Sequence, residues 1–257
     1  MIPKVIHYCW FGRNELPETA VKCISSWRKY FPEYEIKEWN EDNFDVNVIP
    51  YTKEAYAAKK YAFVSDYARF DILYRYGGLY FDTDVEVIKN FEDIIGKGPF
   101  MGCELDYTGK SDLKVAPGLG LGCDMHNSFY LKLLELYKTL KFKNEDGSIN
   151  TKTIVEYTTD LLRSEGLQSK DNEIQKVAGL YIYPSDFFCP KNYATGEIKI
   201  TNNTCCIHHY DASWCTSAYK KMIEEKKWIY QKVSNRILRK LLTKLVVLKK
   251  IIIEKIK

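Results

Sequence analysis

Two aspartates one residue apart, Asp82 and Asp84, are the side chains of this sequence best suited to chemistry. They follow the apolar run Leu79–Phe81, which has the composition of a short buried strand, and the two-residue period of a strand predicts both carboxylates on one face. Ligands of open α/β sheets bind at the carboxyl ends of strands. Mg²⁺ or Mn²⁺ is commonly held there by one or two carboxylates together with substrate phosphates. The pair therefore predicts a divalent cation that activates a phosphate leaving group.

The segment that precedes this strand carries three more polar residues, Ser65, Asp66 and Arg69, within a largely apolar and aromatic run. The apolar side chains that recur at helical spacing are Phe63, Tyr67, Phe70 and Leu73. This spacing predicts a mostly buried helix that ends at Gly77-Gly78. Asp66 and Arg69 are three residues apart and share one face of it. Because buried charges need partners or a function, we expect both to belong to the same site.

Elements earlier in the chain predict an α/β fold that positions this site. Lys4–Trp10 reads as a strand, Pro17–Tyr30 as a helix and Tyr34–Trp39 as a second strand. A helical region, Lys53–Tyr76, follows. A strand–helix–strand beginning is typical of nucleotide-binding α/β domains. Pro117–Gly122 is predicted as a loop beside the site. Asn127–Lys141 and Thr153–Arg163 are predicted as helices, and Tyr181–Tyr183 and Cys205–Tyr210 as strands.

The composition indicates a globular chain, since 46% of its 257 residues are hydrophobic and 28% are charged. The 8 cysteines form no C-x-x-C pair and fit no zinc spacing, so we expect free thiols in a reducing compartment. The first residues lack the long apolar run of a signal peptide, and no run is long enough to span a bilayer. These features predict a cytoplasmic protein.

The charge is distributed unevenly. Lys220 to Lys257 holds 13 Lys and Arg against 3 Glu, a net charge of +10, whereas the rest of the chain carries −6. Apolar residues recur there every three or four positions from Ile229 to Ile256, which predicts a basic amphipathic helix. We expect a catalytic part, 1–219, and a helical tail, 220–257, that holds the protein at the inner, anionic face of the membrane. A nucleic-acid partner is not expected, because no recognised nucleic-acid motif accompanies the basic residues.

Four segments in order carry a resemblance to a known family: IPKVIHYCWFG at the start, SDYARFDILYRYGGLYFDTDVEV, YPSDFFCP at 183–190 and IHHYDASW at 207–214. Together they resemble glycosyltransferase family 32, sugar-transferring enzymes with a D-x-D motif whose bacterial members include proteins of capsular polysaccharide synthesis. Catalytic domains of clostridial glucosylating toxins are distant relatives. The resemblance implies a GT-A fold, which is Rossmann-like, and Mn²⁺ or Mg²⁺ as cofactor. It also implies a nucleotide-sugar donor such as a UDP-sugar, a glycan or lipid-linked acceptor, and retention of anomeric configuration.

The resemblance also implies roles for single residues. Trp10 stacks on the nucleotide base, and the pair Asp66 and Arg69, with Ser65 beside it, contacts the donor sugar. The implied residues of the D-x-D region are Tyr80, which precedes the motif, Asp82, which contacts donor hydroxyls and indirectly the metal, and Asp84, which binds the metal directly.

Further positions near the C-terminal end and after the second strand follow from the same resemblance. His208 or His209, with His208 preferred, supplies another ligand for the metal or the diphosphate, and Ser213 with Trp214 covers the diphosphate. The segment Trp39–Asp42 is expected to help hold the base or ribose.

Other D-x-D proteins fit the sequence less well. Phosphatases of the haloacid-dehalogenase type need Thr or Val where this chain has Glu86, and they carry the motif after their first strand. A calcium loop needs a glycine soon after its acidic residues, and Val85–Ile88 offers none. The alternative that stays open is a membrane-surface nucleotide-binding or scaffold protein without transferase activity.

Overall fold

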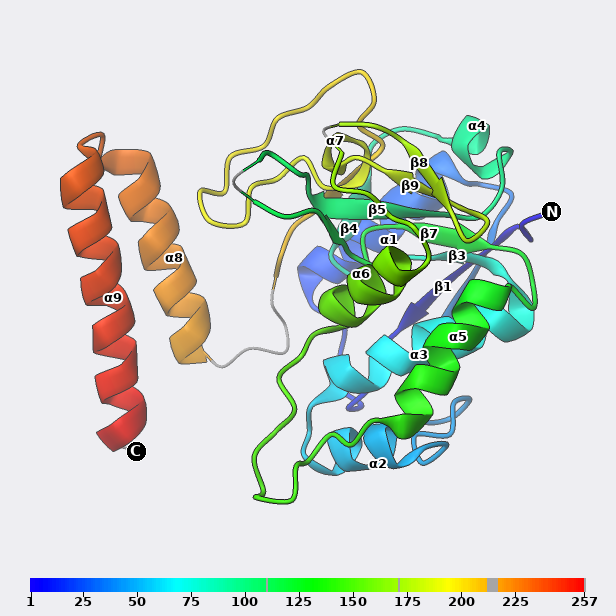
Figure 1. The fold of residues 1–257 in the computed structure, drawn as a ribbon, viewed down its shortest axis with the longest axis horizontal. Coiled ribbons are helices and arrows are strands. Elements are labelled where there is room, and N and C mark those ends of the chain that lie inside the picture. The colour runs from blue at the N-terminus through cyan, green and yellow to red at the C-terminus, as the bar shows by residue number, and fades with distance from the viewer. Residues whose placement is uncertain (110, 171, 212–216, 257) are drawn as a thin grey trace. The chain divides into compact units, whose positions relative to one another are not determined.

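The computed structural model describes residues 1–109, 111–170, 172–211 and 217–256 (Figure 1). Its contacts divide the chain into two units, and each is described by itself. The first unit comprises Met1–Pro190 with Ile200–His209, and the second comprises Lys191–Lys199 with Tyr210–Lys257.

An eight-stranded sheet forms the centre of the first unit in the described residues, in the order β2-β1-β3-β7-β5-β9-β8, with β6 paired to β5. Its strands are β1 (Val5–Cys9), β2 (Glu35–Trp39), β3 (Gly78–Tyr80), β5 (Phe100–Leu105), β6 (Lys114–Val115), β7 (Leu121–Cys123), β8 (Gln175–Val177) and β9 (Leu180–Tyr183). β1 is parallel to β2 and β3, β5 is parallel to β9, and β7 runs antiparallel between β3 and β5. Strands β2, β1, β3, β5 and β9 therefore share one direction and end at one edge. This mixed sheet confirms the predicted α/β fold class.

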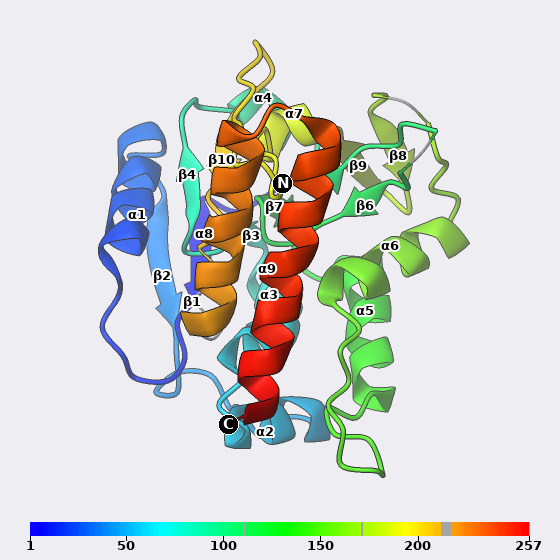
Figure 2. The same cartoon turned by 90° about the vertical axis from the view of Figure 1, so that its left-hand side faces the viewer.

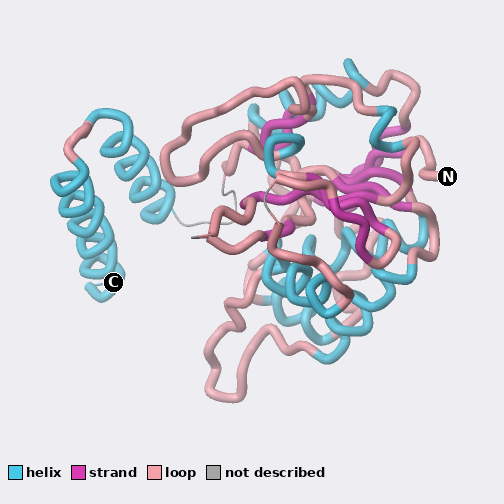
Figure 3. Tube along the Cα trace, turned by 45° about the horizontal axis from the view of Figure 1, so that its top comes forward, coloured by secondary structure: helices cyan, strands magenta, loops and turns pink. Residues whose placement is uncertain are grey.

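Helices cover both faces of this sheet (Figure 3). Those of the first unit are α1 (Glu18–Tyr30), α2 (Pro50–Ala57), α3 (Tyr61–Tyr76), α4 (Glu92–Ile95), α5 (Ser128–Thr139), α6 (Ile154–Ser164) and α7 (Ser185–Phe188). Trp27 of α1 packs on Tyr8 and Phe81, with ring centroids 5.7 and 5.3 Å away. Residues one position along, Cys9 and Tyr80, join the core on the α3 side instead. The alternation of strand side chains thus sends α1 and α3 to opposite faces.

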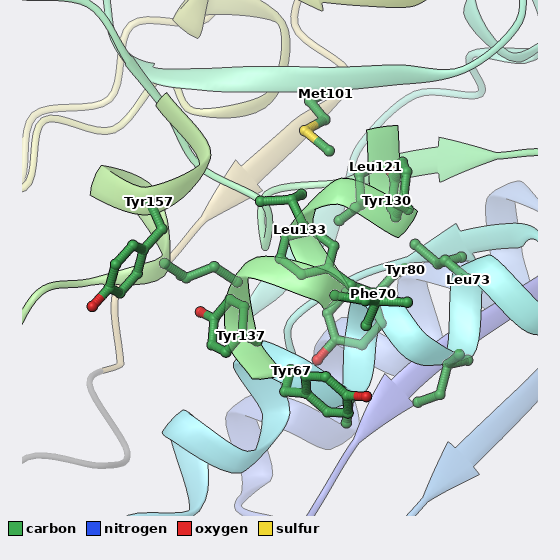
Figure 4. Close-up of a cluster of buried hydrophobic side chains, with 14 of the residues drawn as sticks. Tyr67, Phe70, Leu73, Tyr80, Met101, Leu121, Tyr130, Leu133, Tyr137 and Tyr157 are labelled. Atoms are coloured by element: carbon green, nitrogen blue, oxygen red, sulfur yellow. The ribbon is translucent and has the colours of Figure 1, made fainter. Parts of the chain in front are cut away.

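Aromatic rings fill the space between α3, α5 and the sheet (Figure 4). Phe70 of α3 packs edge-on against Tyr130 of α5, and Tyr67, one turn earlier on α3, contacts Tyr137, two turns later on α5. Both helices are fixed against the sheet by this core, because burial of large aromatic rings is strongly favourable. Helix α3 is the element that carries the predicted Ser65, Asp66 and Arg69, so the core sets their position.

A second, two-stranded sheet joins distant parts of the first unit. β4 (Val85–Val87) follows the D-x-D motif directly, and β10 (Cys206–His208) pairs with it antiparallel. The register places His208 opposite Val85. Trp27 Nε1 donates a hydrogen bond to the carbonyl of Val85 at 2.7 Å, which ties β4 to α1. The chain therefore returns late to the residues that follow the motif.

In its described residues the second unit contains two helices, α8 (Ser217–Lys232) and α9 (Arg236–Ile256), which lie side by side as a hairpin (Figure 2). The sequence predicted one continuous amphipathic helix over this region. The break occurs because the Asn235 side chain accepts hydrogen bonds from the backbone N–H groups of Ile237 and Leu238, at 3.0 and 3.1 Å, and so starts a new helix. Among the described residues no helix has the length and apolarity that crossing a membrane requires.

Candidate functional site

Asp82 lies just beyond the carboxyl end of β3, at the edge where the five codirectional strands end. Tyr80, two residues earlier, faces α3, and its hydroxyl donates a hydrogen bond to Asp82 Oδ1 at 3.2 Å. The backbone N–H of Asp82 donates to the carbonyl of Gly118 at 3.0 Å. The period of the strand therefore aims the Asp82 carboxylate toward α3, where the sequence places Asp66 and Arg69.

Arg69 is the centre of this part of the site, although only 4% of its surface is exposed. Its guanidinium donates to Asp66 Oδ1 at 3.0 Å, to Asp82 Oδ2 at 3.2 Å, and to the carbonyls of Ser65 and Pro117. It also lies over the Tyr80 ring, 4.9 Å from the centroid. Because a planar guanidinium can bind several acceptors at once, Arg69 joins α3, the end of β3 and the loop at Pro117.

The electrostatics of these carboxylates are set by burial. Burial raises the pKa of Asp66 to about 7, while the Arg69 charge opposes this and Asp82 adds to it. Burial also raises the pKa of Asp82, Arg69 again opposes it, and the nearby Asp84 raises it further. Three carboxylates thus share this edge of the sheet with one guanidinium. Such a cluster favours an additional cation.

Gly118 permits the close approach of the loop to these groups. A Cβ atom at this position would lie 2.0 Å from Asp82 Oδ2 and 2.9 Å from Arg69 Nη1. Any side chain would displace one of them, so the absence of a side chain is required here. The sequence identified Pro117–Gly122 as a loop beside the site but gave no role to Pro117 or Gly118. The glycines of this segment were the sequence feature that could have indicated a close approach of the backbone to the site.

Asp84 does not continue the strand, in contrast to the alternation expected from the sequence. β3 ends at Tyr80, and Asp82–Val85 form a turn closed by a hydrogen bond from the Val85 N–H to the Asp82 carbonyl at 3.0 Å. The turn points Asp84 toward β10, where His208 Nε2 lies 3.2 Å from Asp84 Oδ1. Burial alone would lower the pKa of His208, but Asp84, aided by Cys189, outweighs it and raises that pKa well above its usual range.

The two histidines have different partners because neighbouring residues at a strand end face opposite ways. His208 contacts Asp84, whereas Nε2 of His209 lies 2.8 Å from Glu86 Oε2. The backbone N–H of His209 donates to the Asp84 carbonyl at 2.9 Å. The structure therefore brings His208, the preferred residue of the pair, to the D-x-D motif, and places the His209 ring on Glu86.

Glu104, which the sequence did not single out, lies at the end of β5, at the same edge of the sheet as Asp82. Burial raises the pKa of Glu104, and the charge of His208 is the largest influence that lowers it. Glu104 is thus a fourth carboxylate in the field of the site. Glu104 was not identified as a site residue from the sequence because Phe100–Leu105 was not recognised as a strand.

The predicted base-binding residues lie at the ends of β1 and β2. Trp10 follows β1 directly, is half-buried, and donates through Nε1 to the carbonyl of Asn14 at 2.7 Å. The next turn passes close to α3, since a Cβ at Gly12 would lie 2.4 Å from the Tyr61 ring. Trp39 is buried in the core, where its indole N–H bonds to Nδ1 of His7 at 3.0 Å, so its ring is not available for a base.

Ser65 is half-buried on α3, where its hydroxyl donates to the carbonyl of Tyr61 at 3.3 Å. Ser213 and Trp214 lie outside the described residues. The seven cysteines described are free thiols, as expected: Cys9, Cys23, Cys103, Cys123, Cys189, Cys205 and Cys206.

The donor atoms near Asp84 fit a divalent cation that is shared with a substrate. Among the residues that the structure describes, no group of three or more His, Cys, Asp or Glu side chains is arranged as a metal cage. Asp84 and His208 are close enough to act together, and Asp82 is a neighbouring carboxylate. Mg²⁺ and Mn²⁺ use such sparse oxygen and nitrogen sets when phosphate oxygens complete the coordination.

The chain is similar to known glycosyltransferases. Residues 17–101 match the family described as the glycosyltransferase sugar-binding region containing a DXD motif. Inositol phosphoceramide mannosyltransferase 3 of Schizosaccharomyces pombe is 33% identical over 98 residues, which cover 37% of this chain and 27% of the yeast protein. An uncharacterised glycosyltransferase of Acanthamoeba polyphaga mimivirus is 26% identical over 222 residues, which cover 83% of this chain and 84% of the viral protein.

Two solved structures are also similar. PaToxG glycosyltransferase has a TM-score of 0.48 and 21% identity, over 64% of this chain and 70% of that chain. Galactosyltransferase LgtC, in complex with donor and acceptor sugar analogs, has a TM-score of 0.40 and 14% identity, over 90% of this chain and 96% of that chain. Asp82 and Asp84 lie inside the matched region and at the carboxyl edge of an α/β sheet, so residues 17–101 are similar to the glycosyltransferase sugar-binding region in both sequence and the position of the DXD motif.

Proposed function

We propose that this protein transfers a sugar from a nucleotide-sugar donor to a glycan or lipid-linked acceptor, with Mn²⁺ or Mg²⁺ as cofactor. The observation that carries the proposal is the buried Arg69, which bonds both Asp66 and Asp82 beside the Asp84–His208 pair. A buried guanidinium between two carboxylates fixes a rigid polar surface, as the recognition of sugar hydroxyls requires. A divalent cation bound through Asp84 would supply positive charge to the departing diphosphate.

The residues of the chain divide this work between them. Asp82 and Asp66 accept hydrogen bonds from donor hydroxyls, and Arg69 keeps the two carboxylates in place. The Tyr80 hydroxyl fixes the second oxygen of Asp82. Trp10, at the end of the neighbouring parallel strand, offers an aromatic face to the base. These positions support a donor that lies along the edge of β1 and β3, because parallel strands bind nucleotides at that edge.

The identities of the donor and the acceptor are also part of the proposal. A UDP-sugar donor, retention of anomeric configuration and a role in surface polysaccharide synthesis follow from the family resemblance. The name of the yeast relative refers to a mannosyltransferase of inositol phosphoceramide, a lipid, and this supports a lipid-linked acceptor.

A panel of nucleotide sugars tests the function directly. Purified protein is incubated with each donor, with and without Mn²⁺, and both the melting temperature and the release of nucleotide diphosphate are measured. We expect one donor to raise the melting temperature only with metal and to be hydrolysed slowly, because a ligand that binds the folded state stabilises it. The Asp84→Asn variant is the matched control and should show neither effect.

The same panel of nucleotide sugars distinguishes a transferase from the alternative function, a nucleotide-binding or scaffold protein. A nucleotide-binding or scaffold protein would be stabilised by a nucleotide but would release no diphosphate with any sugar or acceptor. No response to any donor with any divalent metal would reject the transferase and leave Asp82 and Asp84 as an acidic turn. Once the donor is known, the anomeric configuration of the product decides between retention and inversion.

A further inference from the structure

Exposed apolar side chains gather on the helical hairpin of the second unit. Between 48% and 74% of the surface of each of the following residues is exposed: Trp228, Ile237, Leu238, Leu241, Leu245 and Leu248. Single exposed leucines are ordinary on protein surfaces, but a contiguous set of this kind marks a binding surface.

The five residues on α9 form one continuous strip. Ile237, Leu241, Leu245 and Leu248 follow one another at intervals of four, four and three, which keeps them on one face, and Leu238 borders this face. At a rise of about 1.5 Å per residue, the strip is about 17 Å long. We call these five residues the α9 strip.

The neighbouring helix widens this apolar surface. Trp228 of α8 lines a groove between the two helices together with Leu245 and Lys249. Leu242 and Val246, on the side of α9 next to the strip, line the same groove. The exposed indole therefore adjoins the α9 strip at Leu245. Tryptophan is favoured where an apolar phase meets water, because its ring is apolar while its N–H is polar.

Basic side chains flank the α9 strip on both sides. At 3.6 residues per turn, Lys240 and Lys244 project along one border of the strip, and Lys249, which pairs with Glu225 of α8 at 3.4 Å, projects along the other. Long lysine side chains beside an apolar strip can extend along it and keep their charge in the polar layer. The region from Lys220 to Lys257 carries 13 Lys and Arg against 3 Glu. An apolar strip bordered by cations matches a surface that is apolar below a layer of anions.

We propose that the hairpin binds the anionic surface of a lipid bilayer, with α9 lying in the plane of the membrane and the α9 strip inserted below the headgroups. The apolar strip supplies insertion, and the flanking lysines supply attraction to anionic lipids, a combination typical of interfacial helices. The proposal does not depend on the transferase activity. It would bring the site to a membrane-borne acceptor.

Vesicle flotation of the full chain tests the proposal. The probes are phosphatidylcholine vesicles with and without phosphatidylglycerol, at low and at high salt. We expect binding to the anionic vesicles to exceed binding to the neutral ones at least about tenfold, and to weaken with salt because the lysine contribution is screened.

Paired variants separate insertion from charge. The double variant Leu241→Glu with Leu245→Glu should lose at least about tenfold in binding, because two inserted side chains become charged. The matched control is Val21→Glu with Leu131→Glu, which adds two carboxylates at exposed apolar positions of α1 and α5 and should bind as the wild type does. The variant Lys240→Glu with Lys244→Glu should lose the preference for anionic vesicles.

Three results would overturn the proposal. One is equal binding of the wild type to neutral and anionic vesicles, and another is undiminished binding of the Leu241 and Leu245 double variant. The third is a change in the free protein: if that double variant splits a lipid-free dimer in light scattering, or lowers the melting temperature as a core substitution does, the strip is covered by protein. The transferase assay with a soluble acceptor is unaffected by any of these outcomes.

Discussion

His208 Nε2 lies 3.2 Å from Asp84 Oδ1, although the two residues are far apart in the sequence of the first unit. The pairing of β10 with β4 creates this contact. An imidazole and a carboxylate in contact share a proton, and a metal cation that binds both groups must displace this proton. The contact therefore links the metal chemistry proposed for the D-x-D motif to a strand that follows it by almost half of the chain.

Replacing Asp84 by Asn should remove metal-dependent turnover. The amide has the size of the carboxylate but no negative charge, so the fold is kept while affinity for the cation falls, and we expect at least about a hundredfold loss of activity. Turnover is measured against Mn²⁺ concentration. Glu86→Gln is the control, because it removes a carboxylate two residues away that bonds to His209. Asp84→Asn with wild-type turnover would refute the proposed role.

Replacing Arg69 by Lys should destabilise the protein by about 3 kcal/mol, because an ammonium cannot reach all the acceptors of the buried guanidinium. The free energy of unfolding is measured by urea titration. Arg75→Lys, on the same helix, is the control: its half-exposed side chain pairs with Asp71, and the change should cost less than about 1 kcal/mol. Equal losses in the two variants would contradict the central role of Arg69.

Replacing Gly118 by Ala should impair donor binding more than folding. The added methyl group meets Asp82 Oδ2 and Arg69 Nη1, so these groups must move from the positions that the donor uses. We expect at least about a tenfold weaker response to donor in the thermal-shift titration. Wild-type affinity for the donor would show that the loop can retreat without disturbing Asp82.

His7 gives a prediction for acid stability. Burial lowers the pKa of His7 to about 4, even though its ring bonds to the carbonyl of Gly77 at 3.0 Å. Below pH 6.5 the unfolded chain takes up a proton that the folded chain does not, so stability falls toward pH 4 by up to about 1.4 kcal/mol per pH unit. Below pH 4 the folded state also binds the proton, and the loss ends.

A variant isolates this effect. Asp66, with its pKa raised to about 7, acts in the opposite direction, because its stability contribution declines as pH rises from 3.8. His7→Gln does not titrate and can still accept from Trp39 and donate to Gly77. The difference in unfolding free energy between wild type and His7→Gln should therefore shift against the wild type from pH 6.5 to 4. A difference independent of pH would contradict the lowered pKa.

Local patterns were sufficient for the first half of the fold. The expected strand, helix and strand at the start are β1, α1 and β2, with bounds within one residue, and the aromatic spacing around Phe70 gave α3. Each of these elements buries an apolar face within its own segment, so its period is visible in the sequence. The contact of Asp66 with Arg69 followed for the same reason, since it lies within one helix.

Long-range pairing accounts for what the sequence did not show. β5, β6, β7 and β8 were not predicted, because most are two or three residues long and are defined by their partners. Gly122 of β7 lies against Phe100 and Leu79 of the neighbouring strands. Because of this packing, the last part of the expected loop forms a strand instead. Glu104 could be found only after β5 was known. The turn at Asp84 likewise depends on β10, which is distant in sequence.

The small sheet of β4 and β10 has a consequence for the order of events during synthesis. A chain emerging from the ribosome can assemble α1, α3 and the strands around β3 long before residues 206–208 exist. Until then Asp84 has no imidazole beside it. Premature termination before Cys206 would therefore yield a product that retains Arg69 with Asp66 and Asp82 but lacks the histidine. Competence for the proposed metal would thus be among the last properties that the nascent protein acquires.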